Sequence, residues 1–155
     1  MILLVHMLFG AAIGSIIKNP ILAVFLAFLG HYFLDLFPHV EYLQSVESLL
    51  KKIKENKLKE VMYGIIKVFL DFCLGILIIF IFSKNQIIIY LCAFITLIPD
   101  GLTVINSLFF HPILQRHQKI HGEKVHFLKN KKIPKFWRIS TQIVTITISI
   151  ILLKL

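Results

Sequence analysis

Three side chains that commonly bind metal ions recur at four-residue intervals near the start of the chain: His31, Asp35 and His39. On an α-helix, residues four apart lie on one face, about one turn from each other. The stretch closes an apolar run that begins at Pro20, and Pro38 is expected to end the helix. Because an ionisable group inside an apolar helix is costly, His31 and Asp35 indicate a functional site. We expect His39, beyond the proline, to lie at headgroup level and to contribute less.

His6 is the next ionisable group in an apolar segment, and it is followed by Gly10 and Gly14 at four-residue spacing. These three residues share one helix face, and faces of small residues let membrane helices approach closely. We therefore predict that His6 points into a helix bundle, towards His31 and Asp35. The alternative is a lone histidine that is bonded to a neighbouring hydroxyl.

The sequence Ile98-Pro99-Asp100-Gly101 interrupts a later apolar run. Pro99 lacks a backbone donor, so it frees the carbonyl of Ile95. A broken helix within a membrane is tolerated where it lines protein or a cavity. We predict that Asp100 faces the same site, the alternative being a solvated carboxylate at a simple kink.

A second histidine pair, His117 and His121, is again spaced by four residues, and Glu123 follows it. A helical HxxxH pair can hold one ion, although this pair lacks the glutamate of the HExxH motif of zinc enzymes. Glu123 is a candidate general base. The alternative is a solvated basic loop that binds lipid phosphate, in which Glu123 pairs with a lysine.

Asp71 is a further carboxylate in an apolar run, and Lys67 precedes it by four residues. Two interpretations stay open. Asp71 either forms an ion pair with Lys67 on one helix face, or it serves the site as a base or as a carboxylate that orients a ligating histidine.

Together these residues form a set of imidazoles and carboxylates without a thiolate, which suits Zn²⁺ and also Mn²⁺. Six candidates exceed one tetrahedral shell, so two ions could fit. Cys73 and Cys92 lie in apolar runs without zinc-type spacing and are expected to be inert. The predicted ligands are His6, His31, Asp35, Asp100, His117 and His121, and the predicted bases are Asp71 and Glu123.

The elements that must position these residues are membrane helices. The chain has 155 residues, of which 57% are hydrophobic, and its mean hydropathy is +0.84. This composition predicts an all-α, multi-pass helical bundle forming a single domain. Asn19-Pro20 is a typical helix start, and residues 1–17 lack the basic segment of a signal peptide. The predicted spans are about 2–17, 20–37, 61–82, 86–110 and 137–153.

Charge orients the bundle. Loops 38–60 and 111–136, with the residues bordering the last span, carry thirteen basic residues, whereas the opposite side receives Lys18, Lys84 and Lys154. The positive-inside rule therefore places the N-terminus in the cytoplasm and the C-terminus outside, and it explains the net charge of +9 without nucleic acid. Residues 41–60 show apolar residues at helical spacing beside lysines, which predicts an amphipathic helix on anionic lipid. All seven histidines then fall on the cytoplasmic side.

The order of these motifs resembles a known family. A histidine in the first span, HxxxD in the second, Pro99-Asp100 in a later span and the His117–His121 pair are similar to the LexA-binding, inner-membrane-associated hydrolases. That group shows an Asp-x-Asp-His run where this chain has Asp100-Gly101-Leu102. The resemblance implies a metal-dependent hydrolase of the inner membrane.

We therefore expect a metal site at the cytoplasmic leaflet that hydrolyses a lipid ester, amide or phosphodiester, because a headgroup reaches that depth. Two other classes stay open. A metal-ion transporter subunit would explain the broken helix, but the sequence places no acidic or histidine side chain in the outer half of the membrane to continue an ion pathway. A non-catalytic adaptor that binds anionic lipid or a partner would explain the lysines and leave the buried His/Asp set without a role.

Overall fold

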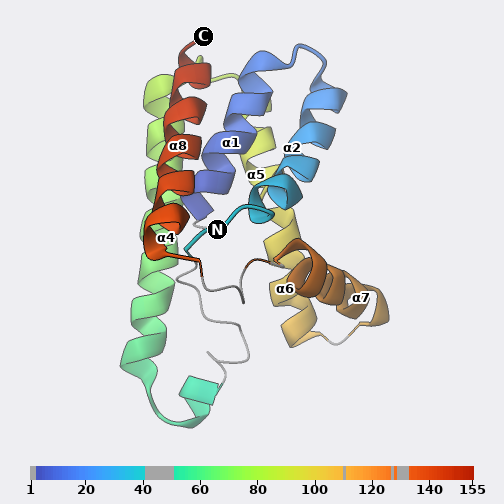
Figure 1. Ribbon diagram of the computed structural model, residues 1–155, viewed down its shortest axis with the longest axis vertical. Helices are drawn as coiled ribbons and strands as arrows, with labels where there is room; N and C mark the ends of the chain where they lie inside the picture. The colour runs from blue at the N-terminus through green and yellow to red at the C-terminus, as the bar shows by residue number, and fades with distance from the viewer. Residues whose placement is uncertain (1–2, 41–50, 110, 127, 129–132) are drawn as a thin grey trace.

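The computed structural model describes residues 3–40, 51–109, 111–126, 128 and 133–155, and every regular element within them is helical (Figure 1). This confirms the predicted all-α class. The elements are α1 (Leu3–Ile16), α2 (Pro20–Asp35), α4 (Leu58–Phe82), α5 (Ile87–Ile95), α6 (Ile98–Leu108), α7 (Pro112–Ile120), the π-helix η1 (His121–Val125) and α8 (Lys135–Lys154).

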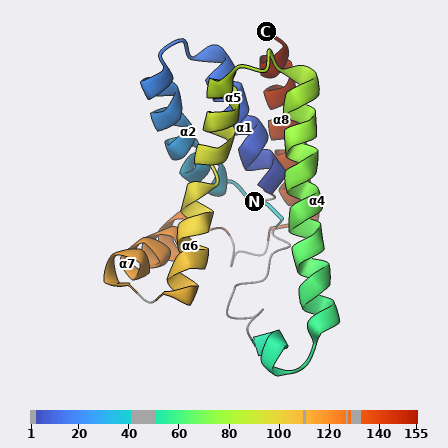
Figure 2. The same ribbon diagram turned by 180° about the vertical axis from the view of Figure 1, so that it is seen from behind.

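Helix α1 is the centre of the bundle, and it packs against α2, α4, α5 and α8 (Figures 1 and 2). The absence of a side chain at Gly10 allows α1 to approach α5 closely, because a Cβ there would lie 2.5 Å from the carbonyl oxygen of Cys92 on α5. A Cβ on Gly14 would lie 3.0 Å from the carbonyl oxygen of Ile88 on the same helix. The small-residue face of α1 therefore faces the bundle, as predicted from its spacing.

Helix α2 begins where the sequence predicts. The side chain of Asn19 accepts hydrogen bonds from the backbone amides of Ile21 and Leu22, at 3.0 and 3.1 Å, and Pro20 occupies the first turn. The helix ends at Asp35, short of the proline at position 38. The last turn of α2 thus presents His31 and Asp35 at one end of the bundle.

The predicted span 86–110 is broken in two. Helices α5 and α6 meet at an angle of 45°, because Pro99 in the first turn of α6 prevents a continuous helix. Beyond the break, α7 lies against α6, and the side-chain amide of Asn106 donates to the side-chain oxygen of Gln118. Figure 2 shows α6 and α7 extending from the end of the bundle away from the C-terminus.

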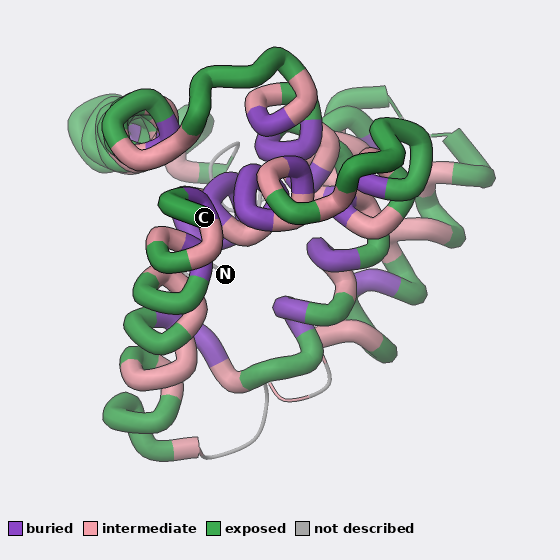
Figure 3. Tube along the Cα trace, turned by 90° about the horizontal axis from the view of Figure 1, so that it is seen from above, coloured by how far each residue is buried: buried purple, intermediate pink, exposed green. Residues whose placement is uncertain are grey.

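Two helices, α4 and α8, are long and apolar enough to cross a membrane, and the bent pair α5 and α6 makes a third candidate. Large apolar side chains on α4 are exposed, among them Phe69 and Phe80, as expected for contact with lipid. Figure 3 shows buried segments gathered towards the centre of the bundle and exposed segments around it. Helices α1 and α2 are apolar but have only 14 and 16 residues, fewer than the roughly 20 that a span requires. The structure thus has two or three helices that could cross a membrane, fewer than the five predicted spans.

The predicted surface helix over 41–60 lies partly outside the described residues, which omit 41–50. Residues 51–54 are helical, and Asn56 turns the chain with a φ of 56°. The prediction is wrong for its last part, because Leu58 begins α4 and the long apolar helix takes up residues 58–60.

Candidate metal centre

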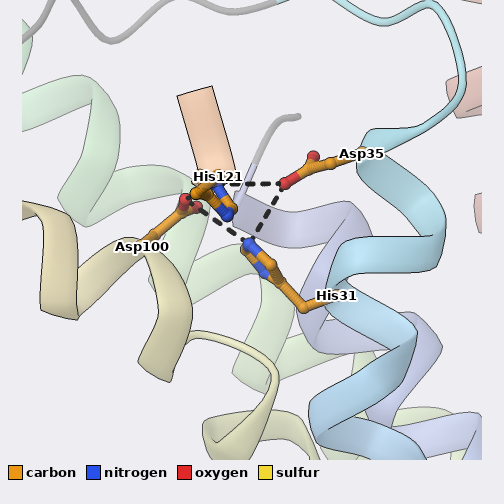
Figure 4. Close-up of side chains that lie close together, drawn as sticks. All are labelled: His31, Asp35, Asp100 and His121. Carbon is orange, nitrogen blue, oxygen red and sulfur yellow. Dashed lines mark ion pairs between the residues drawn. The ribbon is translucent and has the colours of Figure 1, made fainter. Parts of the chain in front are cut away.

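Four ligand-type side chains from three elements meet at the end of α2. Helix α2 contributes His31 and Asp35, α6 contributes Asp100, and η1 contributes His121, and we call these four residues the His31 group (Figure 4). One ligand atom from each lies within 4.8 Å of the others. The side chains of His31 and Asp35 are fully buried, whereas that of Asp100 is 42% exposed and forms the open side.

The distances within the His31 group suit a single small cation. Nε2 of His31 lies 3.1 Å from Oδ2 of Asp35 and 3.6 Å from Oδ1 of Asp100. Nε2 of His121 lies 3.6 and 3.5 Å from the same two oxygens. Ligands in a tetrahedral zinc site lie about 2.0–2.2 Å from the metal, which makes the edges of the tetrahedron about 3.3–3.6 Å. Three of the four observed separations fall within that range, and the fourth, 3.1 Å between His31 and Asp35, is slightly shorter.

The ring of His31 is held by the broken helix. Its Nδ1 lies 2.7 Å from the carbonyl oxygen of Thr96, between α5 and α6. A carbonyl can only accept, so Nδ1 carries the proton, and in a neutral ring Nε2 presents a lone pair to the carboxylates. The hydroxyl of Thr96 in turn donates to the carbonyl of His6, at 3.0 Å. Such outer contacts are typical of metal-binding histidines.

His6 is fully buried beside this group, as predicted. Its ring stacks on that of His31 with 4.3 Å between centroids, and its Nε2 lies 3.3 Å from Oδ1 of Asp35. Neither ring nitrogen makes a hydrogen bond within the described part of the chain. His6 therefore belongs to the buried cluster of histidines and aspartates around Asp35, although it is not one of the four residues of the His31 group.

A second group shares one residue with the first. Asp35, His39 and His126 also lie with their ligand atoms within 4.8 Å of one another, and we call them the His39 group. We expected His39 to contribute less than His31 and Asp35, but it is only 7% exposed and lies beside Asp35. Helix α8 holds the segment that contains His39 by two hydrogen bonds. The hydroxyl of Thr141 donates to the carbonyl of Pro38 at 2.5 Å, and Nε2 of Gln142 donates to the carbonyl of Val40 at 3.0 Å.

His126 was not among the predicted ligands. Its backbone amide donates to the carbonyl of His121 at 3.1 Å, which is the i to i+5 bond of a π-helix. On an α-helix these two residues would face different directions, whereas the π-turn brings their Nε2 atoms to 3.0 Å. The available sequence signal was the five-residue spacing from His121 to His126, which predicts a shared site only if a π-turn is assumed.

The remaining predicted residues lie outside both groups. Nε2 of His117 is 2.9 Å from the hydroxyl of Tyr32, and burial together with the imidazoles of His121 and His31 lowers the pKa of His117. Glu123 is exposed on η1. Asp71 accepts a hydrogen bond from the backbone amide of Leu4 at 2.8 Å, at the start of α1.

The assignments of Asp71 and Glu123 as bases therefore lack support from the site. The carboxylate of Asp71 satisfies a backbone amide in the first turn of α1, where negative charge is favourable. The Nζ atom of Lys67, the predicted partner of Asp71, lies 4.2 Å from the ring centre of Tyr63 instead.

Comparison of the chain with protein-family models, curated proteins and solved structures gives no match.

Proposed function

We propose that the His31 group binds a divalent metal ion, most readily Zn²⁺ and otherwise Mn²⁺, and that the chain is a membrane-embedded metal-dependent hydrolase. The donor set supports this choice, because two imidazoles and two carboxylates without a thiolate suit these ions. The separations of 3.1–3.6 Å between the four ligand atoms support it further.

The observation that carries the proposal is the orientation of His31. With the Nδ1 proton donated to Thr96, the lone pair of Nε2 faces Asp35 and Asp100 in a buried environment. Lone pairs and carboxylates brought together out of water repel each other and are expensive to desolvate. A proton on Nε2 would relieve one contact, whereas a divalent cation relieves all four ligands at once.

If an ion held by these four side chains took up a water as a fifth ligand, it would lower the pKa of that water towards about 7 and polarise a carbonyl or phosphoryl oxygen. The chain's own residues supply the rest of the site. Asp100 is 42% exposed, so water and substrate can approach on its side, while the burial of His31 and Asp35 excludes water from the other. A carboxylate already at the open side makes Asp100 a better candidate for proton transfer than Asp71 or Glu123.

We assign the substrate to lipids: an ester, amide or phosphodiester near the headgroup. The C-terminal end of α2 and the start of α6, which carry His31, Asp35 and Asp100, lie on the side of the bundle away from the C-terminus (Figure 1). Lys84 and Lys154 lie at the C-terminal end, where Lys84 donates to the terminal carbonyl of Leu155 at 2.7 Å and Lys154 lies 4.9 Å from the ring centre of Phe82. This is the side that receives few basic residues. The positive-inside rule therefore favours the cytoplasmic leaflet of the inner membrane for the opposite end, where the metal site lies. The resemblance to the inner-membrane-associated hydrolases rests on the His31 group together with His6, Pro99 and His117, and stays a prediction.

The first experiment is elemental analysis of protein purified in detergent without chelators. We expect wild type to carry zinc or a similar ion, and His31→Ala and Asp35→Ala to lose it. The matched controls are His111→Ala and Glu123→Ala, which remove an exposed imidazole and an exposed carboxylate and should leave the metal content unchanged. Removal of the ion should also lower the melting temperature, because an ion that binds only the folded state stabilises it.

Metal-free wild type would refute the proposal and favour the non-catalytic adaptor. Wild type that holds metal is then assayed against lipid esters, amides and phosphodiesters in mixed micelles. We expect turnover of one class, lost on chelation and in Asp35→Ala and retained in His111→Ala. A metal-loaded protein that hydrolyses none of the three, but moves the ion across vesicles, would favour the transporter.

A further inference from the structure

Asp35 occupies a position that one metal ion does not account for. Its carboxylate is fully buried, and imidazoles approach both of its oxygens. Oδ2 lies 3.1 Å from Nε2 of His31 and 3.3 Å from Nε2 of His126. Oδ1 lies 3.3 Å from Nε2 of His6 and 3.9 Å from Nε2 of His39. The imidazoles of His39 and His126 are not among the ligands of an ion in the His31 group.

The ring of His39 is oriented in the same way as that of His31. Nδ1 of His39 lies 2.8 Å from the carbonyl oxygen of Phe37, so this nitrogen carries the proton. In the neutral ring, the lone pair of Nε2 is therefore directed to the side of Asp35. His31 and His39 lie four residues before and after Asp35, and each has its Nδ1 fixed by a backbone carbonyl. This arrangement prepares both imidazoles to bind a metal through Nε2.

The position of His39 is built by other parts of the fold. The bonds from Thr141 and Gln142 of α8 fix the carbonyls on either side of His39, and the π-turn of η1 brings His126 opposite it. The rings of His39 and His126 pack edge to face with 5.2 Å between centroids. Helix α8 and η1 thus position the imidazoles of His39 and His126 beside the buried carboxylate of Asp35.

We propose that the His39 group binds a second divalent ion, and that the carboxylate of Asp35 bridges the two ions. This inference rests on the proposed function, since it takes the first ion to occupy the His31 group. Hydrolytic enzymes with two metals hold them about 3.5–4 Å apart, commonly with a shared ligand. Asp35 is the one residue common to both groups, so it is the bridging ligand.

The test uses the full-length chain in lipid nanodiscs, loaded with Mn²⁺ and freed of excess metal. We expect about two equivalents per chain in wild type, with the exchange-coupled electron paramagnetic resonance spectrum of a manganese pair. His39→Ala and His126→Ala should each retain about one equivalent and give the six-line spectrum of isolated Mn²⁺. His111→Ala, the exposed histidine control, should keep both ions and the coupled spectrum.

Thr141→Val keeps every ligand and removes only the hydroxyl that holds Pro38. It should weaken binding of the second ion about 10–100-fold, the effect of losing an outer contact, and leave the first unchanged. Wild type with one equivalent that His39→Ala and His126→Ala both retain would overturn the second ion while the proposed function stands. Wild type without any metal would overturn both. Two equivalents without exchange coupling would overturn the bridge.

Discussion

Replacement of Gly10 by alanine tests how tightly α1 must approach α5 to build the site. The added Cβ would lie 2.5 Å from the carbonyl oxygen of Cys92 and 2.6 Å from Cγ2 of Thr96. The oxygen belongs to the backbone, so it cannot rotate away and the two helices must separate. Thr96 would move with α5, and its carbonyl orients the ring of His31.

Two opposing effects set the magnitude. Alanine is a better helix former than glycine by about 1 kcal/mol, whereas overpacking a tight core costs about 1–3 kcal/mol. We therefore expect Gly10→Ala to destabilise the fold by about 1 kcal/mol on balance. For a chain of this size the melting temperature should fall by about 2–4 °C, and binding of the metal should weaken because His31 loses its support.

Gly101→Ala is the matched control, because a Cβ at Gly101 meets nothing within 4 Å. It should gain the helix propensity without the clash and raise the melting temperature slightly. Thermal unfolding of both variants in one detergent, with zinc titration of each, measures the difference. If Gly10→Ala proved as stable as Gly101→Ala, the close α1–α5 approach and its role in the site would be refuted.

Two further predictions concern residues away from the cluster. Asp71→Ala should lower stability by about 1.5–3 kcal/mol, because the amide of Leu4 loses a charged acceptor; its metal content should equal that of wild type, and loss of metal would restore Asp71 to the site. A reporter fused after Leu155 should lie outside the cytoplasm and one inserted near Glu55 inside; both on the same side would contradict the assigned orientation.

Local spacing was enough to find the centre of the candidate site. The four-residue interval places His31 and Asp35 on one face of α2, and the interval from His6 to Gly10 and Gly14 turns His6 into the bundle. These patterns are properties of a single helix, which composition and capping also predict. The break at Pro99 likewise follows from the missing backbone donor.

Contacts between distant segments decided the rest. Asp71 lies against the start of α1 because α1 and α4 pack together, a pairing that no local pattern near Asp71 records. His39 joins the cluster because α8, about a hundred residues later, bonds the carbonyls beside it.

The sequence by itself thus determined an apolar, all-helical chain with a His/Asp face on α2, since helix periodicity and hydropathy depend only on neighbouring residues. The tertiary structure alone decided that His39 and His126 belong to the cluster and that Glu123 does not. The physical reason is that helix periodicity does not extend to either residue. His39 follows Pro38, and its position depends on the hydrogen bond from Thr141 of α8. His126 follows a π-turn, in which the backbone hydrogen bond spans five residues instead of four.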